Sequence, residues 1–360
     1  MERFICKTQI LSGAGSLVQL GQLHIRRLLI VADPFFYENG TVNHIAHICG
    51  AAETEVFAQV TPDPSVKLAA EGAQLVKTFR PDTLLALGGG SAMDCAKAMA
   101  YFSDLPLRLI AVPTTSGSGS EVTNFAILTH EGVKHPLVDD RLRPDLAILD
   151  SDLLTSLPPA LIADGGFDLI SHALEAWVAT DGGRFSQTLA AQALATAFSL
   201  LAGSYGGDQS CRLPLHQAAT MAGIAFSTAG LGLCHAISHA LGGEFHKPHG
   251  RLNAVLLPAV LDHNSQYVLP AYATLARRLG LSSGTDAIAF RALKNNLLRL
   301  RRQLGLPETL AVLGIAPSLL EQKLDAIVTA VLADPCCATN PSVPESHHIR
   351  QILHQVMGHG

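Results

Sequence analysis

Four histidines gather in the stretch GLGLCHAISHALGGEFHKPHG, residues 230–250. His235 and His239 are four residues apart, so on a helix they project from one face, one turn apart. His246 and His249 follow them on a segment that contains glycine and proline. Histidine is the commonest metal ligand in proteins, and its charge changes most easily near neutral pH. The stretch therefore predicts a site for a metal ion or for proton transfer.

A carboxylate and a further histidine have the same spacing in DGGFDLISHALEAWV. Asp168 and His172 would share one face of a helix and could bind one ion together. An isolated pair of this kind is more often a surface hydrogen bond, but the flanking residues here are apolar and a buried Asp168 needs a partner. Oxygen and nitrogen donors suit Fe(II), zinc or manganese and require no thiolate. Spacing alone leaves the following candidates, with weaker claims from Cys234 and His246: Asp168, His172, His235, His239 and His249.

Two glycine-containing loops each follow an apolar run that is typical of a strand. In the first, LLALGGGSAMDCAKAMA, three glycines precede a helix, whose N-terminal N–H groups and dipole favour an anion. Taken alone, this loop could instead be a tight turn with Ser91 as the helix N-cap. The second loop, TTSGSGS at residues 114–120, offers hydroxyl groups and glycine for phosphate, ribose or amide contacts. Two such loops in one domain favour a dinucleotide.

An acidic residue directly follows the apolar run at residues 28–32. At the end of a strand beside a nucleotide site, Asp33 could accept hydrogen bonds from ribose hydroxyls and repel a 2′-phosphate. The alternative role is that of a turn former ahead of Pro34. In the functional interpretation, Asp33 predicts NAD rather than NADP.

Composition narrows the class of protein. The 360 residues are 48% hydrophobic and 15% charged, with a formal net charge of -5, which argues against nucleic acid or an anionic membrane as the main partner. The uncharged stretch at residues 185–207 contains serine, threonine and glutamine and is expected to be a buried helix rather than a membrane span. Seven cysteines without a CxxC pair fit a reducing compartment, and MERFICKTQI does not look like a secretory signal. We therefore expect a cytoplasmic protein.

The order of predicted elements indicates two domains. Strand and helix patterns alternate through the first half, which predicts a mostly parallel sheet flanked by helices. From residue 160 onward the pattern is helical, and we place the boundary near residue 158, giving domains 1–158 and 159–360. The helices expected in the second domain span residues 160–179, 185–201, 216–227, 287–304 and 317–332.

Over essentially its full length the chain resembles the iron-dependent (group III) alcohol dehydrogenases. The matching motifs are GGGSAMDCAKA, PTTSGSGSEVT, DLAILD, FDLISHALEAW and GLGLCHAISHALGGEFHKPHG. The resemblance implies an N-terminal Rossmann-like α/β domain that binds NAD and an all-α C-terminal domain that binds metal, in a fold shared with dehydroquinate synthase.

The resemblance also implies roles for single residues. The metal ligands would be Asp168, His172, His235 and His249. His239 would stand apart from them as the catalytic residue, near the nicotinamide in a proton relay, with His246 in support. The cofactor contacts would be Asp33, Gly88, Gly89, Gly90, Ser91, Asp94, Thr114, Thr115, Ser118 and Lys134. The chain departs from the family pattern in GGFD, where TGMD or GVD is common, and in Arg251 after PHG, which could alter the field at the site.

Within the family, the motifs look most like those of the 1-propanol dehydrogenases of propanediol-utilisation microcompartments, with the ethanol dehydrogenases of ethanolamine utilisation close behind. This kinship implies NAD-dependent interconversion of short primary alcohols and aldehydes, either propanal to 1-propanol or ethanal to ethanol. Fe(II) is the expected metal, and zinc is the alternative. A homodimer or larger homo-oligomer is expected, in the cytoplasm or inside a microcompartment, where an aldehyde dehydrogenase or shell proteins would be partners.

Two other functions remain as alternatives. A lyase related to dehydroquinate synthase would need basic residues around a phosphorylated, acidic substrate, and the histidine-rich stretch offers only Lys247 and Arg251. A non-catalytic protein that binds NAD and metal would be expected to lack a ligand or His239, and none of these residues is missing.

Overall fold

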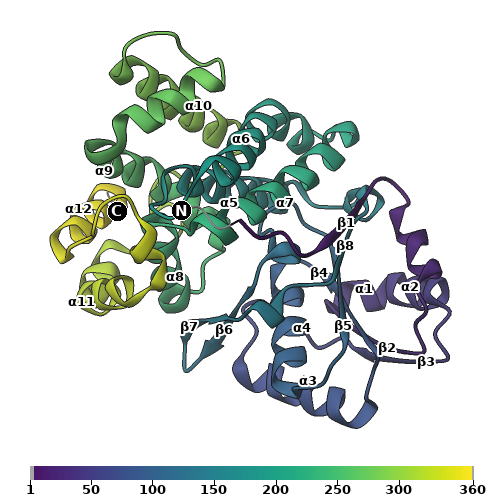
Figure 1. Ribbon diagram of the computed structural model, residues 1–360. Coiled ribbons are helices and arrows are strands. Elements are labelled where there is room, and N and C mark those ends of the chain that lie inside the picture. The colour runs from purple at the N-terminus through teal and green to yellow at the C-terminus, as the bar shows by residue number, and fades with distance from the viewer. Residues whose placement is uncertain (1–3, 359–360) are drawn as a thin grey trace. The chain divides into compact units, whose positions relative to one another are not determined.

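The computed structural model describes residues 4–358, and its chain divides into two units. One unit comprises Cys6–Leu157, and the other runs from Pro158 onward together with Phe4 and Ile5. Each unit is described by itself below (Figure 1).

A six-stranded parallel sheet forms the centre of the unit Cys6–Leu157, in the order β1-β8-β5-β4-β2-β3. A separate antiparallel pair, β6 and β7, lies outside this sheet. The strands are β1 (Gln9–Ser12), β2 (Arg27–Ala32), β3 (Glu53–Phe57), β4 (Thr83–Gly88), β5 (Arg108–Pro113), β6 (Phe125–His130), β7 (Val133–Val138) and β8 (Leu146–Leu149). The α-helices are α1 (Pro34–Glu38), α2 (Thr41–Cys49), α3 (Val66–Phe79) and α4 (Gly90–Ser103). Short 3₁₀ helices cover Ser16–Gln22, Ser120–Val122, Asp140–Leu142 and Ser151–Leu154.

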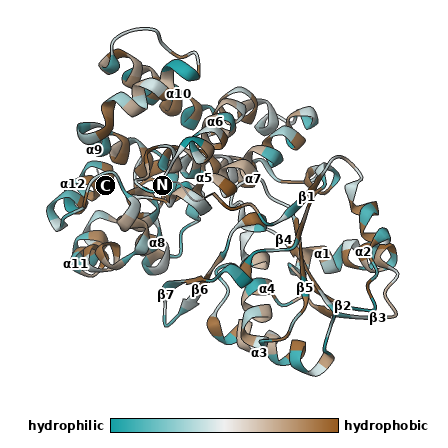
Figure 2. Ribbon diagram, viewed as in Figure 1, coloured by the Kyte–Doolittle hydropathy of each residue, from teal (hydrophilic) through white to brown (hydrophobic). Residues whose placement is uncertain are grey.

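Beyond their first residues, the inner strands of this sheet are apolar, and both faces are covered. Alternate side chains of β2, Leu29 and Val31, pack with Val76 of α3 and Met93 of α4. The intervening side chains face the other way and pack with helix α2 and the first 3₁₀ helix: Leu28, Ile30, Ala32, Val42, Ile45, Leu17 and Leu20. A parallel sheet buried on both sides needs such continuous apolar strands, and the hydropathy colouring in Figure 2 follows them.

The order of the strands places a switch point between β2 and β4. After β2 the chain moves outward to β3, whereas after β4 it moves in the other direction to β5. Ligands of open α/β sheets bind at the carboxyl ends of the strands at such a point. Here Asp33 follows β2, and β4 ends at Gly88, with Gly89 and Gly90 leading into α4.

Helices joined by turns and loops make up the described part of the unit that starts at Pro158, which contains no strand. Its α-helices are α5 (Pro159–Val178), α6 (Arg184–Tyr205), α7 (Arg212–Ala229), α8 (Leu233–Phe245), α9 (His249–Arg278), α10 (Asp286–Gln303), α11 (Pro317–Ala333) and α12 (Ser346–Met357). Short 3₁₀ helices cover Gln209–Cys211 and Pro335–Thr339. Helix α6 is long and apolar enough to cross a membrane, as are α7 and α8 together if their bend is ignored. Because α6 packs along α5 and α7 and buries Leu194, Ala197 and Leu201, we assign it to the core of this unit.

Candidate metal and cofactor sites

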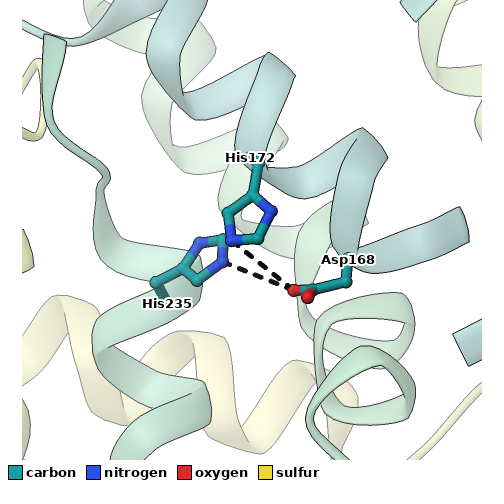
Figure 3. Close-up of side chains that lie close together, drawn as sticks. All are labelled: Asp168, His172 and His235. Carbon is teal, nitrogen blue, oxygen red and sulfur yellow. Dashed lines mark ion pairs between the residues drawn. The ribbon is translucent and has the colours of Figure 1, made fainter. Parts of the chain in front are cut away.

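Four predicted ligands converge in the helical unit. Helix α5 carries Asp168 and His172, α8 carries His235, and α9 begins at His249. Oδ1 of Asp168 lies 3.7 Å from Nε2 of His172, 3.7 Å from Nε2 of His235 and 3.5 Å from Nε2 of His249. Figure 3 shows the first three of these side chains pointing toward one another.

These distances fit a single bound cation. Donor atoms about 2.1 Å from a tetrahedral ion are about 3.4 Å apart, close to the separations from Oδ1 of Asp168. His235 is 1% exposed, and its Nε2 atom makes no hydrogen bond to any described residue. A buried nitrogen left in this way requires a ligand or carries a desolvation cost. The donor set therefore suits a divalent metal of the iron or zinc type.

Charge at the cluster also favours a cation. Burial opposes ionisation of Asp168, but the neighbouring histidines outweigh it and hold the pKa of this carboxyl well below its usual range. Burial likewise opposes the charged form of His235, yet Glu175 and Asp168 outweigh it and raise the pKa of His235 to about 9. Both shifts reflect a site in which negative charge attracts either protons or a metal ion.

The remaining histidine of the helical pair has different surroundings. Nδ1 of His239 lies 2.8 Å from Oδ2 of Asp334, which follows α11. The ring stacks on that of His249, with centroids 5.3 Å apart and planes 15° apart. Burial disfavours the charged form of Asp334, but His239 outweighs it and lowers the pKa of the carboxyl. His239 thus has a fixed ring and a carboxylate partner of its own.

Two residues near the cluster shape the chain at the start of α9. His246 ends α8 with a φ of 51°, in the left-handed region, and makes the turn that leads to Pro248. A Cβ on Gly250 would lie 1.9 Å from the carbonyl oxygen of Asp164, so only glycine allows α9 to approach α5 here. Arg251 donates from Nε to both carboxylate oxygens of Asp164, at 2.9 and 3.2 Å, so its charge is balanced locally.

The two predicted cofactor loops lie against each other in the sheet unit. Thr114 donates its backbone N–H to the carbonyl of Gly88, at 2.9 Å. A Cβ on Gly89 would lie 3.3 Å from Oγ1 of Thr115, and one on Gly90 would lie 3.3 Å from Ser118. Gly88 has a φ of 149°, and a Cβ there would lie 2.6 Å from Ala92. Ser91 follows in the first turn of α4, whose N-terminus is therefore bordered by small residues and hydroxyl groups.

Asp94 fastens these two loops together. Its carboxylate accepts hydrogen bonds from Oγ of Ser120 at 2.8 Å and from the backbone N–H of Ile127 at 3.0 Å. Nearby, Nζ of Lys97 donates to Ser120 and to both oxygens of Thr123 at distances of 2.8 to 3.1 Å. Burial raises the pKa of Asp94 and lowers the pKa of Lys97 to about 8. The structure thus occupies both Asp94 oxygens with the protein's own groups.

The last two predicted cofactor residues also have partners within the chain. Asp33 is the N-cap of α1 and accepts from the N–H of Phe35 at 2.9 Å, so the turn-forming role is present. Its Cβ lies 3.7 Å from the position of a Cβ on Gly88, at the switch point of the sheet. Lys134 lies on β7 and pairs with Asp63, with 2.6 Å between Nζ and Oδ1.

Three residues at these sites were not identified from the sequence. Glu175 accepts from Nδ1 of His235, Asp334 from His239, and Asn253 donates to Oδ1 of Asp168 at 3.0 Å. For Glu175 a signal existed, because it is three residues after His172 and seven after Asp168, on the same helical face. Asp334 and Asn253 are distant in sequence from their partners and have no comparable pattern.

Family models match both halves of the chain. The model of the iron-containing alcohol dehydrogenases covers residues 7–151, and that of the C-terminal part of the Fe-containing alcohol dehydrogenase family covers residues 162–357. The 1-propanol dehydrogenase PduQ of Citrobacter freundii is 37% identical over 99% of this chain and 100% of its own length. The NADPH-dependent butanol dehydrogenase of Clostridium saccharobutylicum is 35% identical over 98% of this chain and 97% of its own.

Solved structures agree with this assignment. An iron-containing alcohol dehydrogenase from Thermococcus thioreducens is 33% identical, covers 98% of this chain and 99% of its own, and superimposes with a TM-score of 0.91. A 1,3-propanediol oxidoreductase is 27% identical, covers 99% of this chain and 100% of its own, and superimposes with a TM-score of 0.93. The chain therefore belongs to the iron-containing alcohol dehydrogenase family. The predicted fold class, the dehydrogenase activity on small alcohols or aldehydes, and the cofactors NAD(H) and iron are confirmed.

Proposed function

We propose that this alcohol dehydrogenase acts on C2–C4 primary alcohols and aldehydes, with propanal or ethanal as the substrate that it reduces in the cell. Metal dependence is inferred from one observation: three imidazole Nε2 atoms converge on Oδ1 of Asp168. Similarity to a 1-propanol dehydrogenase and to a butanol dehydrogenase supports the substrate class.

In this proposal Asp168, His172, His235 and His249 hold one Fe(II) or zinc ion. When bound, the ion supplies Lewis-acid polarisation of the substrate oxygen, and NAD(H) supplies the hydride chemistry. The residues of the chain place these groups and control the proton. Asp168 contributes the negative charge of the ligand set, and the three histidines contribute neutral nitrogen donors.

His239 is the residue that carries the proton. With Nδ1–H donated to Asp334, its Nε2 is left to accept a proton from an alcohol or to return one to an aldehyde. The stacked ring of His249 restricts the rotation of the His239 ring, so Nε2 keeps one direction. Asp334 accepts from Nδ1–H and so fixes the tautomer of His239.

The sheet unit would hold the dinucleotide at its switch point. The pyrophosphate would approach the N-terminus of α4, where Gly88, Gly89, Gly90 and Ser91 leave room for it. Thr114, Thr115, Ser118 and Lys134 would contact the rest of the cofactor, and Asp94 would keep the two loops together. Asp33, with one oxygen engaged at the start of α1, would use the other for the ribose and so favour NAD.

Several broader assignments belong to the same proposal. Residues 1–158 form the cofactor domain, and residues 159–360 form the metal domain. The protein works as a homodimer or larger homo-oligomer in the cytoplasm, where it reduces aldehyde and regenerates NAD⁺. The full-length similarity to PduQ supports a place within a bacterial microcompartment, beside an aldehyde dehydrogenase or shell proteins.

An anaerobic assay tests the proposal. Protein loaded with Fe(II) or zinc should oxidise NADH in the presence of ethanal, propanal or butanal, and the metal-free protein should not. His172→Ala serves as the matched control that lacks one ligand. Absence of turnover with every C2–C4 aldehyde would contradict the proposed substrate class.

A further inference from the structure

A buried carboxylate lies behind His235, on the side away from Asp168. Glu175 is 4% exposed and comes from α5, one turn beyond His172. Its Oε2 atom is 2.5 Å from Nδ1 of His235 and accepts from the N–H of Gly232 at 3.0 Å. Its Oε1 atom accepts from the N–H of Cys234 at 2.7 Å. Three donors therefore surround one carboxylate where α8 begins.

We propose that Glu175 is a positioning residue of the metal site, which presents Nε2 of His235 to the cation as an unprotonated donor. The inference rests on the proposed metal site and assigns a new residue to it. Glu175 does not lie within the set of ligands, and its hydrogen bond to that set is made to His235.

The hydrogen-bond pattern explains why the tautomer is fixed. A carboxylate that accepts two backbone N–H bonds has to accept from Nδ1 of His235 as well, because an ionised carboxylate has no hydrogen to donate. The imidazole hydrogen therefore belongs on Nδ1, and the lone pair of neutral His235 is on Nε2. That nitrogen is the buried atom without a hydrogen bond among the described residues.

Charge balance gives Glu175 a second effect. Together, Asp168 and Glu175 carry two negative charges, which a divalent cation neutralises within a buried region. A carboxylate behind a ligating imidazole also increases the basicity of the ligand. Loss of the Glu175 charge would therefore leave a buried excess of positive charge when the cation binds.

The local backbone is built to admit this carboxylate. Gly232, the N-cap of α8, would place a Cβ 2.9 Å from Oε1 of Glu175 and 2.8 Å from Oδ1 of Asn340. Asn340 accepts from the N–H of Leu233 at 3.1 Å, so it caps the same helix end without a hydrogen bond to His235. Glu175 and Asn340 therefore share the structural task, and only Glu175 has the link to the ligand.

This difference supplies the test. Co(II) binding is measured by competition with a chelator for the full-length wild-type protein, Glu175→Gln and Asn340→Ala, together with the melting temperatures of the metal-free forms. Both variants should have lower melting temperatures, because each loses a hydrogen-bond acceptor at the start of α8. Only Glu175→Gln should bind Co(II) more weakly, by about 10- to 100-fold, with shifted d–d absorption bands of the Co(II) protein.

Each contrary result has a separate meaning. Wild-type affinity in Glu175→Gln, or an equal loss in Asn340→Ala, would show that Glu175 only caps the helix. Failure of the wild-type protein to bind Co(II) would contradict the proposed metal site itself and the inference with it. If Glu175→Gln does not fold, ¹⁵N NMR of histidine in zinc-loaded wild-type protein decides: a protonated Nδ1 and metal-bound Nε2 on His235 are expected, and the opposite tautomer overturns the inference.

Discussion

His235 and His239 lie one turn apart on α8, and each has Nδ1 paired with a carboxylate, yet their surroundings differ. His235 is 1% exposed and its Nε2 faces Asp168, whereas the His239 side chain is 16% exposed and stacks on His249. Glu175 is held by two backbone N–H groups at the start of α8, while Asp334 is held by the N–H of Cys336. Because both rings have a carboxylate partner at Nδ1, the roles proposed for them differ through the surroundings of Nε2, which faces Asp168 in His235.

Removal of each ring in turn tests whether the two histidines have different roles, and it should give the largest effect. His235→Ala and His172→Ala should lose the bound metal, because each deletes one nitrogen donor. His239→Ala should retain the metal and lose about 10²- to 10⁴-fold in kcat, the usual contribution of general acid–base catalysis. Metal content of protein purified without oxygen is measured beside kcat. Metal loss in His239→Ala would make it a ligand and reverse the two roles.

A smaller effect is expected when the carboxylate behind His239 is neutralised. Asp334→Asn should lower kcat by about tenfold or more while KM and metal content stay close to the wild-type values, because only the hydrogen bond that orients the His239 ring is weakened. A larger solvent isotope effect on kcat should accompany the change. Cys336→Ala is the matched control, since its backbone N–H still reaches the side chain at position 334. A rise in KM without a fall in kcat would contradict a role in proton transfer.

The pKa of His235 provides a test in the metal-free protein. Because the folded-state pKa of about 9 lies above the ordinary value of 6.5, the protonated ring stabilises the fold fully below pH 6.5. This contribution is lost as the pH rises from 6.5 through 9. Chemical denaturation at several pH values should show the decline in wild-type protein and a flatter profile in His235→Ala. A flat wild-type profile would contradict the charge distribution around His235.

The smallest effect concerns the other unit of the chain. Asp33→Ser keeps an oxygen that can cap α1 but removes the negative charge, so the variant should remain folded. The ratio of kcat/KM for NADH to that for NADPH should fall several-fold, because repulsion of the 2′-phosphate is lost. An unchanged ratio with intact stability would leave Asp33 as a turn former alone.

The sequence predicted the features that depend on residues close together in the chain. The four-residue spacing of His235 and His239 follows from helical periodicity, and the alternating elements of the first half define the parallel sheet. The short strands β1 and β7 have little local signal: β1 has only four residues, and the charged and proline-containing β7 lies outside the main sheet.

The carboxylates of Asp334 and Glu175, which pair with His239 and His235, were not assigned from the sequence. Asp334 is 95 residues from His239 in the chain, and only the packing of α11 and its following loop near α8 brings the two together. A sequence pattern records neighbours along a helix or strand, whereas the partner of a buried polar group depends on the whole tertiary arrangement. Glu175, on the same face as the predicted ligands, lay within reach of helical periodicity but resembled an ordinary helix residue.

The close approach of Gly250 to Asp164 joins the first turn of α9 to α5 directly beside the four candidate ligands. An ion held by Asp168, His172, His235 and His249 would therefore act as a cross-link between three helices that start at residues 159, 233 and 249. Binding to the folded state alone stabilises that state in proportion to the logarithm of the free metal concentration. A shortage of metal would thus lower the stability of the folded protein as well as its activity, because the same ion completes the site and links the helices.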